Sequence, residues 1–103
     1  KSYFLISQAG GANGAPLPSP DISGTIAMAA AAGKVALVKA TTPITSPTDS
    51  NVVDYVGYGK NANAFEGSGP TSDLSATLSA QRKDPNVDTN DNSVDFEVKA
   101  PTP

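Results

Sequence analysis

The sequence predicts an all-β fold of the sandwich or barrel type, on three observations. Apolar residues occur in short islands along the whole chain. The connections between these islands are rich in Gly, Pro, Ser, Thr and Asn, which favour turns. No long segment shows the apolar period of an amphipathic helix. Short strands joined by polar turns are typical of sandwiches and barrels.

We expect strands at six places, where β-branched or aromatic residues gather or alternate with polar ones. They are residues 3–7, 25–29, 34–39, 51–58, 76–82 and 94–99. The alanine-rich run 27–32 also suits the start of a helix, but Gly33 would end that helix within two turns, so we favour a strand over 25–29. A tight turn around residues 31–33 then makes a hairpin of 25–29 with 34–39.

The segment 51–58 has the strongest strand pattern and contains two of the three tyrosines, Tyr55 and Tyr58. Residues three apart on a strand point to opposite faces. We therefore expect one of these tyrosines in the core and the other on the surface.

Length and charge limit the organisation of the chain. Its 103 residues suit one domain, residues 1–100, and the prolines at 101 and 103 are typical of the start of a linker, residues 101–103. The net charge is −3, and the seven basic residues are scattered, so they form no footprint for nucleic acid. No apolar run is long enough to span a membrane.

Missing residue types exclude several chemistries. The chain has no Cys and no His, and therefore no disulfide, Cys/His zinc site or Ser-His-Asp triad. Asp54 and Glu66 are acids with apolar neighbours, and paired carboxylates can hydrolyse glycosides, but nothing in the sequence places these two together. We expect no catalytic residue in this chain and no cofactor-binding residue.

The acidic segment 84–97 offers one candidate metal site. Asp88, Asn90 and Asn92 place oxygen ligands at alternate positions, as at the start of a calcium loop, and Asp95 follows. The glycine of such a loop is replaced by Ser93, and the glutamate that ends it by Lys99. Asx turns, in which Asp and Asn bond their own backbone, explain the same residues, and we favour them over calcium.

Several segments occur along the chain in a characteristic order. They are residues 3–6, 10–14, 17–18, 20–21, 23–28, 33–38, 53–59, 65–67 and 79–82, followed by Asp88-Thr89, Asn92 and Asp95-Phe96, and they include Val53-Asp54-Tyr55-Val56-Gly57-Tyr58-Gly59 and Phe65-Glu66-Gly67. Together these segments resemble the lamin-tail-type domain of bacterial exported proteins. This resemblance covers nearly the whole chain. It implies an immunoglobulin-like β-sandwich whose first strands are missing at the N-terminus. Exposed strand edges would then need a strand-completing partner or an oligomer.

The resemblance also implies a context. Such domains are fused to extracellular nucleases of the endonuclease/exonuclease/phosphatase family, in which a separate domain performs catalysis. We therefore expect a non-catalytic accessory or binding module, extracellular or on the cell surface, whose partners are other domains of the same protein. Nucleic acid is then a partner only through a parent nuclease or phosphoesterase. The alternative is a calcium-stabilised adhesion or scaffolding module. Some relatives carry cysteines where this chain has Ala64 and Asn86, so the disulfide between their loops is missing here.

Overall fold

The computed structural model describes residues 3–10 and 15–102. The chain divides into two compact units, one reaching to Ala29 and one from Ala30 to Pro101. Strands dominate and the described residues hold a single four-residue helix, so the fold is small and β-rich, as the sequence predicts. Among the described residues, no helix is long and apolar enough to cross a membrane.

The N-terminal unit is built on two very short strands. Strand β1 (Ile6–Ser7) pairs in parallel with β2 (Ile22–Ser23). The backbone N–H of Leu5 donates to the Asp21 carboxylate at 2.7 Å, beside this pairing. The strand expected over residues 3–7 is thus only two residues long.

The strand expected over residues 25–29 is wrong. The backbone of Ile26 bonds residues that follow β1: its N–H donates to the side chain of Gln8 at 3.0 Å, and its carbonyl accepts the N–H of Ala9 at 3.1 Å. These two bonds hold the segment beside the end of β1, and they replace the regular backbone pairing of a strand. The predicted hairpin with residues 34–39 is therefore wrong too.

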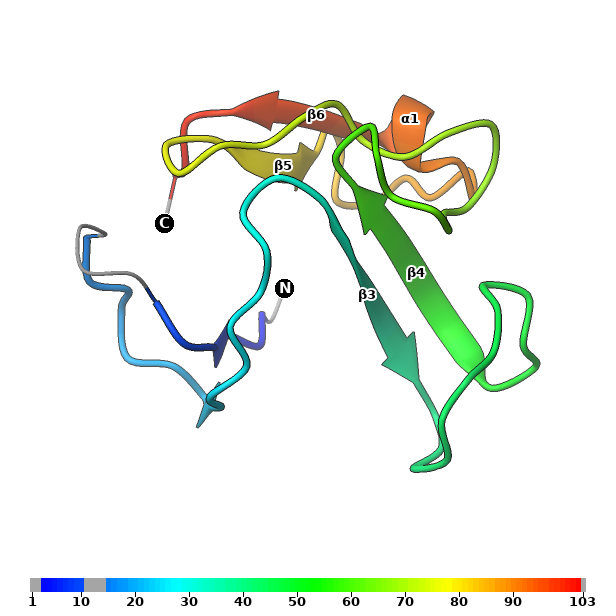
Figure 1. Cartoon of the computed structure of the whole chain (residues 1–103), viewed down its shortest axis with the longest axis horizontal. Helices are drawn as coiled ribbons and strands as arrows, with labels where there is room; N and C mark the ends of the chain where they lie inside the picture. The colour runs from blue at the N-terminus through cyan, green and yellow to red at the C-terminus, as the bar shows by residue number, and fades with distance from the viewer. Residues whose placement is uncertain (1–2, 11–14, 103) are drawn as a thin grey trace. The chain divides into compact units, whose positions relative to one another are not determined.

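The main sheet of the second unit pairs β3 (Gly33–Val38) with β4 (Val52–Tyr58) in antiparallel orientation (Figure 1). Both strands lie where the sequence predicts them. Val35 lies opposite Val56, and the register shifts between Leu37 and Val38. The partner of β3 is thus the apolar segment beyond residue 50, because β4 offers a strand of matching length.

A second pair consists of β5 (Ser79–Arg82) and β6 (Phe96–Lys99), also antiparallel (Figure 1). Helix α1 (Asn92–Asp95), a single turn, leads directly into β6. The prediction of a strand over 94–99 is therefore wrong for its first two residues. Asp91 caps this turn through its side chain, which favours helix over strand there.

Two tyrosines of β4 are the buried apolar residues of the described chain: Tyr55 is 6% exposed and Tyr58 8%. The expectation that one of them lies on the surface is wrong. Residues three apart on a strand point to opposite faces, and here each of the two tyrosine side chains is covered by other parts of the chain. Tyr58 packs against Gly33, which leaves no room for a Cβ atom, and α1 contacts β4.

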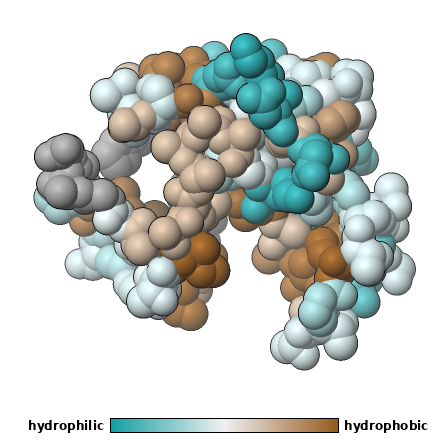
Figure 2. Space-filling model, viewed as in Figure 1, coloured by the Kyte–Doolittle hydropathy of each residue, from teal (hydrophilic) through white to brown (hydrophobic). Residues whose placement is uncertain are grey.

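Many other large apolar residues reach the surface. In the β3–β4 sheet, Val35 is 50% exposed, Val53 57% and Leu37 62%. Figure 2 shows apolar side chains at the surface among polar ones. Burial is thus concentrated at the C-terminal half of β4, where polar side chains of several loops converge.

Candidate functional site

Arg82, the last residue of β5, is the centre of a charged cluster. Its Nη2 lies 2.6 Å from the Asp54 carboxylate, and its Nη1 lies 3.8 Å from Asp88 and 3.7 Å from Asp95. The guanidinium also stacks over the ring of Phe96, 4.7 Å from the centroid, its partner across the β5–β6 ladder. Three carboxylates from three parts of the chain therefore share one cation.

These charges shift the pKa of Arg82 upward. Partial burial alone would lower it, but the hydrogen bond and charge of Asp54, with the charges of Asp88 and Asp95, outweigh that effect. Arg82 therefore stays protonated, as arginine does in proteins generally.

Glu66 adds a fourth carboxylate beside this cluster. Its Oε1 accepts the backbone N–H of Tyr55 at 2.7 Å, and the same N–H lies 2.9 Å from Oδ1 of Asp54. Burial raises the pKa of Glu66, the bond from Tyr55 lowers it, and the charges of Asp54 and Asp88 raise it further, so the net shift is upward. The structure thus brings Asp54 and Glu66 together, which the sequence does not indicate.

Asp95 is the most deeply buried acid of the cluster, with a side chain 2% exposed. Burial would raise its pKa, but the side-chain and backbone hydrogen bonds from Thr89, each 2.8 Å, lower it, and Arg82 lowers it further. The net shift is downward. Asp95 thereby fixes the loop before α1 onto β5.

Asn92, the first residue of α1, is buried and bonds only backbone groups. Its Oδ1 accepts the N–H of Gly57 at 2.9 Å and that of Glu66 at 3.0 Å, and its Nδ2 donates to the carbonyl of Tyr55 at 2.9 Å. A side-chain amide offers the same donor and acceptor as a peptide group. Asn92 therefore takes the place of a neighbouring strand along the outer edge of β4.

Asp91 joins α1 to the glycine-rich loop at residues 67–69. Its carboxylate accepts the side chain of Ser93 at 2.6 Å and that of Ser68 at 2.7 Å, as well as both backbone N–H groups. These bonds, those of Ser93 first, hold the pKa of Asp91 well below its usual range. Gly67 has a φ of 78° and passes so close to Asp91 that a side chain would not fit.

The four predicted calcium ligands do not point to one place. Asp88 and Asp95 both face Arg82, whereas Asn92 faces β4. Asp88 accepts the N–H of Asn90 at 3.0 Å, an Asx turn, and Asn90 has a φ of 56°, which asparagine tolerates. The Asx turns favoured from the sequence are therefore present. Within residues 3–10 and 15–102, no group of three acids is arranged to hold a metal ion, and calcium binding stays a prediction.

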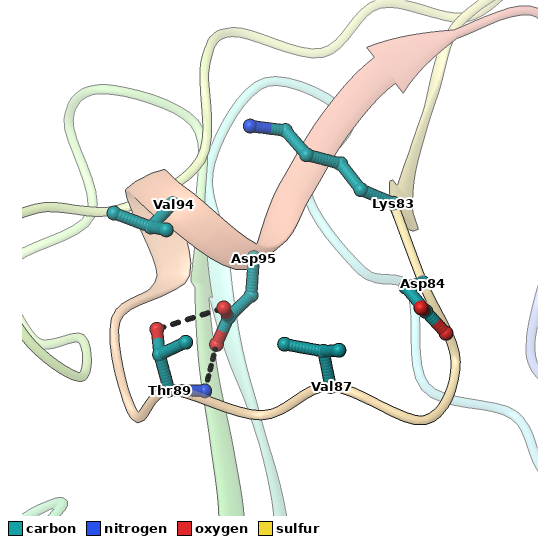
Figure 3. Close-up of a pocket in the computed structure, with 6 residues that line it drawn as sticks. All are labelled: Lys83, Asp84, Val87, Thr89, Val94 and Asp95. Carbon is teal, nitrogen blue, oxygen red and sulfur yellow. Dashed lines mark hydrogen bonds between the residues drawn. The ribbon is translucent and has the colours of Figure 1, made fainter.

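A small pocket of about 130 Å³ lies beside this cluster (Figure 3). Val87 and Val94 give it apolar walls, and Thr89 and Asp95 close one side through the hydrogen bonds drawn in Figure 3. Lys83 and Asp84 complete the lining. The pocket suits a small apolar group, because the polar atoms of Thr89 and Asp95 bond each other.

The sequence does not reveal Arg82, Asn92 and Thr71 as organising residues. Thr71 is 2% exposed; its N–H donates to the carbonyl of Gly57 at 3.0 Å and its hydroxyl accepts the N–H of Gly59 at 3.1 Å. Arg82 bonds Asp54, Asn92 bonds Gly57 and Thr71 bonds Gly59, each across 12 or more positions of sequence, and no local pattern signals such contacts.

Comparison with family models, with curated proteins and with solved structures finds no match to this chain.

Proposed function

We propose that this chain is a non-catalytic accessory or binding module of an exported bacterial protein, with an immunoglobulin-like sandwich as its complete fold. One observation carries the non-catalytic part. The acids that would serve as general acid or base are held by the chain's own groups: Asp54 by Arg82, Glu66 by the N–H of Tyr55, and Asp95 by Thr89. Such contacts support a structural role for the cluster.

The resemblance to lamin-tail-type domains supports attachment to an extracellular nuclease or phosphoesterase, which performs the catalysis. Arg82, the basic residue of the cluster, is occupied by three acids and so offers no free cation for phosphate. Any contact with nucleic acid then comes from the parent enzyme.

Activity assays on the purified chain test this proposal. With DNA, RNA and a chromogenic phosphodiester as substrates, we expect no turnover above buffer. Turnover that Asp54→Asn and Glu66→Gln both abolish would overturn the proposal, because it would assign catalysis to the cluster. Asp73→Asn, in an exposed pair with Lys60, is the matched control.

The coding sequence on either side of residues 1 and 103 tests the context. We expect an export signal and an enzyme domain in the same reading frame. A reading frame with neither feature would refute the attachment to an exported nuclease. The non-catalytic role would then be tested by the activity assays alone.

A further inference from the structure

The two edges of the β3–β4 sheet differ. Along the outer edge of β4, the N–H groups of Tyr55 and Gly57 donate to the side chains of Glu66 and Asn92. Just past the end of β4, the N–H of Gly59 donates to Thr71 in the same way. Among the described residues no strand pairs with β3 on its other side. Within the second unit, one edge of the sheet is therefore closed by side chains and the other is open.

The register shows which backbone groups of β3 face outward. In an antiparallel ladder, directly opposed residues either bond each other or both point away. Tyr55 and Gly57 point away from β3, and they lie opposite Ala36 and Lys34. Ala36 and Lys34 therefore direct their N–H and carbonyl groups away from β4. No described residue bonds these groups.

The surroundings of this edge are apolar in the middle and positive at both ends. Val35 and Leu37 are 50% and 62% exposed. Lys34 donates to the neutral side chain of Asn63 at 2.8 Å, and Lys39 forms no ion pair within the described chain. Antiparallel pairing with β3 of a second copy would place Lys34 of each chain near Lys39 of the other. Repulsion between such like charges disfavours self-association through an edge strand. The charges therefore favour a partner with acids at both ends.

We propose that the open edge of β3 is a strand-addition site for an extended segment of another protein, apolar in the middle and acidic at each end. The segment bonds the outward backbone of Lys34 and Ala36, and its acids meet Lys34 and Lys39. This inference rests on the proposed binding role and names the kind of partner.

A capped peptide with a glutamate at each end of a Val-Thr-Val-Thr core is the probe, because its acids have the spacing of Lys34 and Lys39. We expect binding by calorimetry, and slower amide exchange at Lys34 and Ala36 by NMR on addition of the peptide. The same peptide with lysines in place of the glutamates should bind about tenfold more weakly, the effect of two exposed ion pairs. High salt should narrow this difference.

Two variants of the edge separate strand addition from general stickiness. Ala36→Pro removes an outward N–H and leaves the bonds to β4 in place, which is the position where an edge strand tolerates proline. We expect it to fold and to lose peptide binding. Ala36→Val, which keeps the N–H, is the matched control and should retain binding. If Ala36→Pro does not fold, a peptide N-methylated at alternate residues gives the same test on the unaltered chain, and it should not bind.

Three results would overturn the inference: no binding of the acidic peptide, equal binding of its N-methylated form, or self-association of the chain through β3 that the peptide does not displace. The two proposals fail separately. If the peptide does not bind and the chain shows no turnover on nucleic acids, strand addition is refuted and the non-catalytic role stands. If the chain shows turnover, the non-catalytic role is refuted, whether or not the peptide binds.

Discussion

The side-chain oxygen of Asn92 accepts the backbone N–H of Gly57 at 2.9 Å, across 35 residues of sequence. The same amide donates to Tyr55 on the neighbouring outward position of β4. One side chain thus performs for β4 the bonding of a third strand, and it is 2% exposed while doing so.

Replacement of Asn92 by aspartate should therefore be severe. The carboxylate keeps the acceptor for Gly57 but loses the donor to Tyr55, and it places a charge against a carbonyl in a buried site. We expect a loss of about 2–4 kcal/mol in the free energy of unfolding, measured by chemical denaturation. Asn90→Asp, at an exposed turn, is the control and should change little; equal effects of the two would contradict this role of Asn92.

Arg82 should matter through the acids that it neutralises. Arg82→Gln leaves Asp54, Asp88 and Asp95 without their shared cation, so we expect a loss of about 2 kcal/mol at neutral pH. The loss should shrink in acid, where the carboxylates become protonated. Melting curves across pH test this, with Lys83→Gln as the neighbouring control.

The ionised carboxylate of Glu66 should lower the free energy of unfolding as pH rises. Its pKa is raised in the folded chain, so the folded state binds the proton more tightly, and this contribution is lost as pH rises through the raised pKa. Glu66→Gln keeps an oxygen for the N–H of Tyr55 and removes the repulsion by Asp54. We expect it to be at least as stable as the original chain at neutral pH, with a flatter pH profile. The pKa of Glu97 is instead lowered, because Lys99 donates to its carboxylate at 2.8 Å, so Glu97→Gln should reduce stability at neutral pH.

The carboxyl groups of Asp91 and Asp95 should have the opposite effect on how stability depends on pH. Their pKa values are lowered in the folded chain, so their contribution is present above the ordinary carboxyl pKa and is lost as pH falls through the lowered values. We expect acid unfolding to shift to higher pH in Asp91→Asn, followed by circular dichroism. An unchanged acid midpoint would show that the bonds from Ser68 and Ser93 contribute nothing.

Calcium separates the two interpretations of Asp88, Asn90, Asn92 and Asp95. Because Arg82 already lies between two of these acids and Asn92 faces β4, we expect millimolar calcium to leave the melting temperature unchanged and calorimetry to show no heat. A rise in melting temperature that EDTA reverses and Asp88→Asn abolishes would favour the calcium-stabilised module.

The sequence predicts most strands of the second unit because their pattern is local: β-branched and aromatic residues mark β3 and β4. It fails where tertiary bonds decide. Residues 25–29 alternate like a strand, yet the side chain of Gln8 takes the N–H of Ile26. Val94 reads as strand, yet the cap at Asp91 turns it into helix. Of the candidate site, the acids of 84–97 are visible in the sequence, but their common partner Arg82 comes from the preceding strand.

The place of Asn92 has a chemical consequence for the lifetime of the protein. Asparagine deamidates when the backbone nitrogen of the next residue attacks its side chain, and here the N–H of Ser93 is held by Gly69 and Asp91. Unfolding frees that nitrogen. Deamidation in the unfolded chain would replace the Asn92 amide, which bonds the backbone of β4, with a carboxylate. Molecules that stay unfolded for long would therefore lose the side chain that they need to refold.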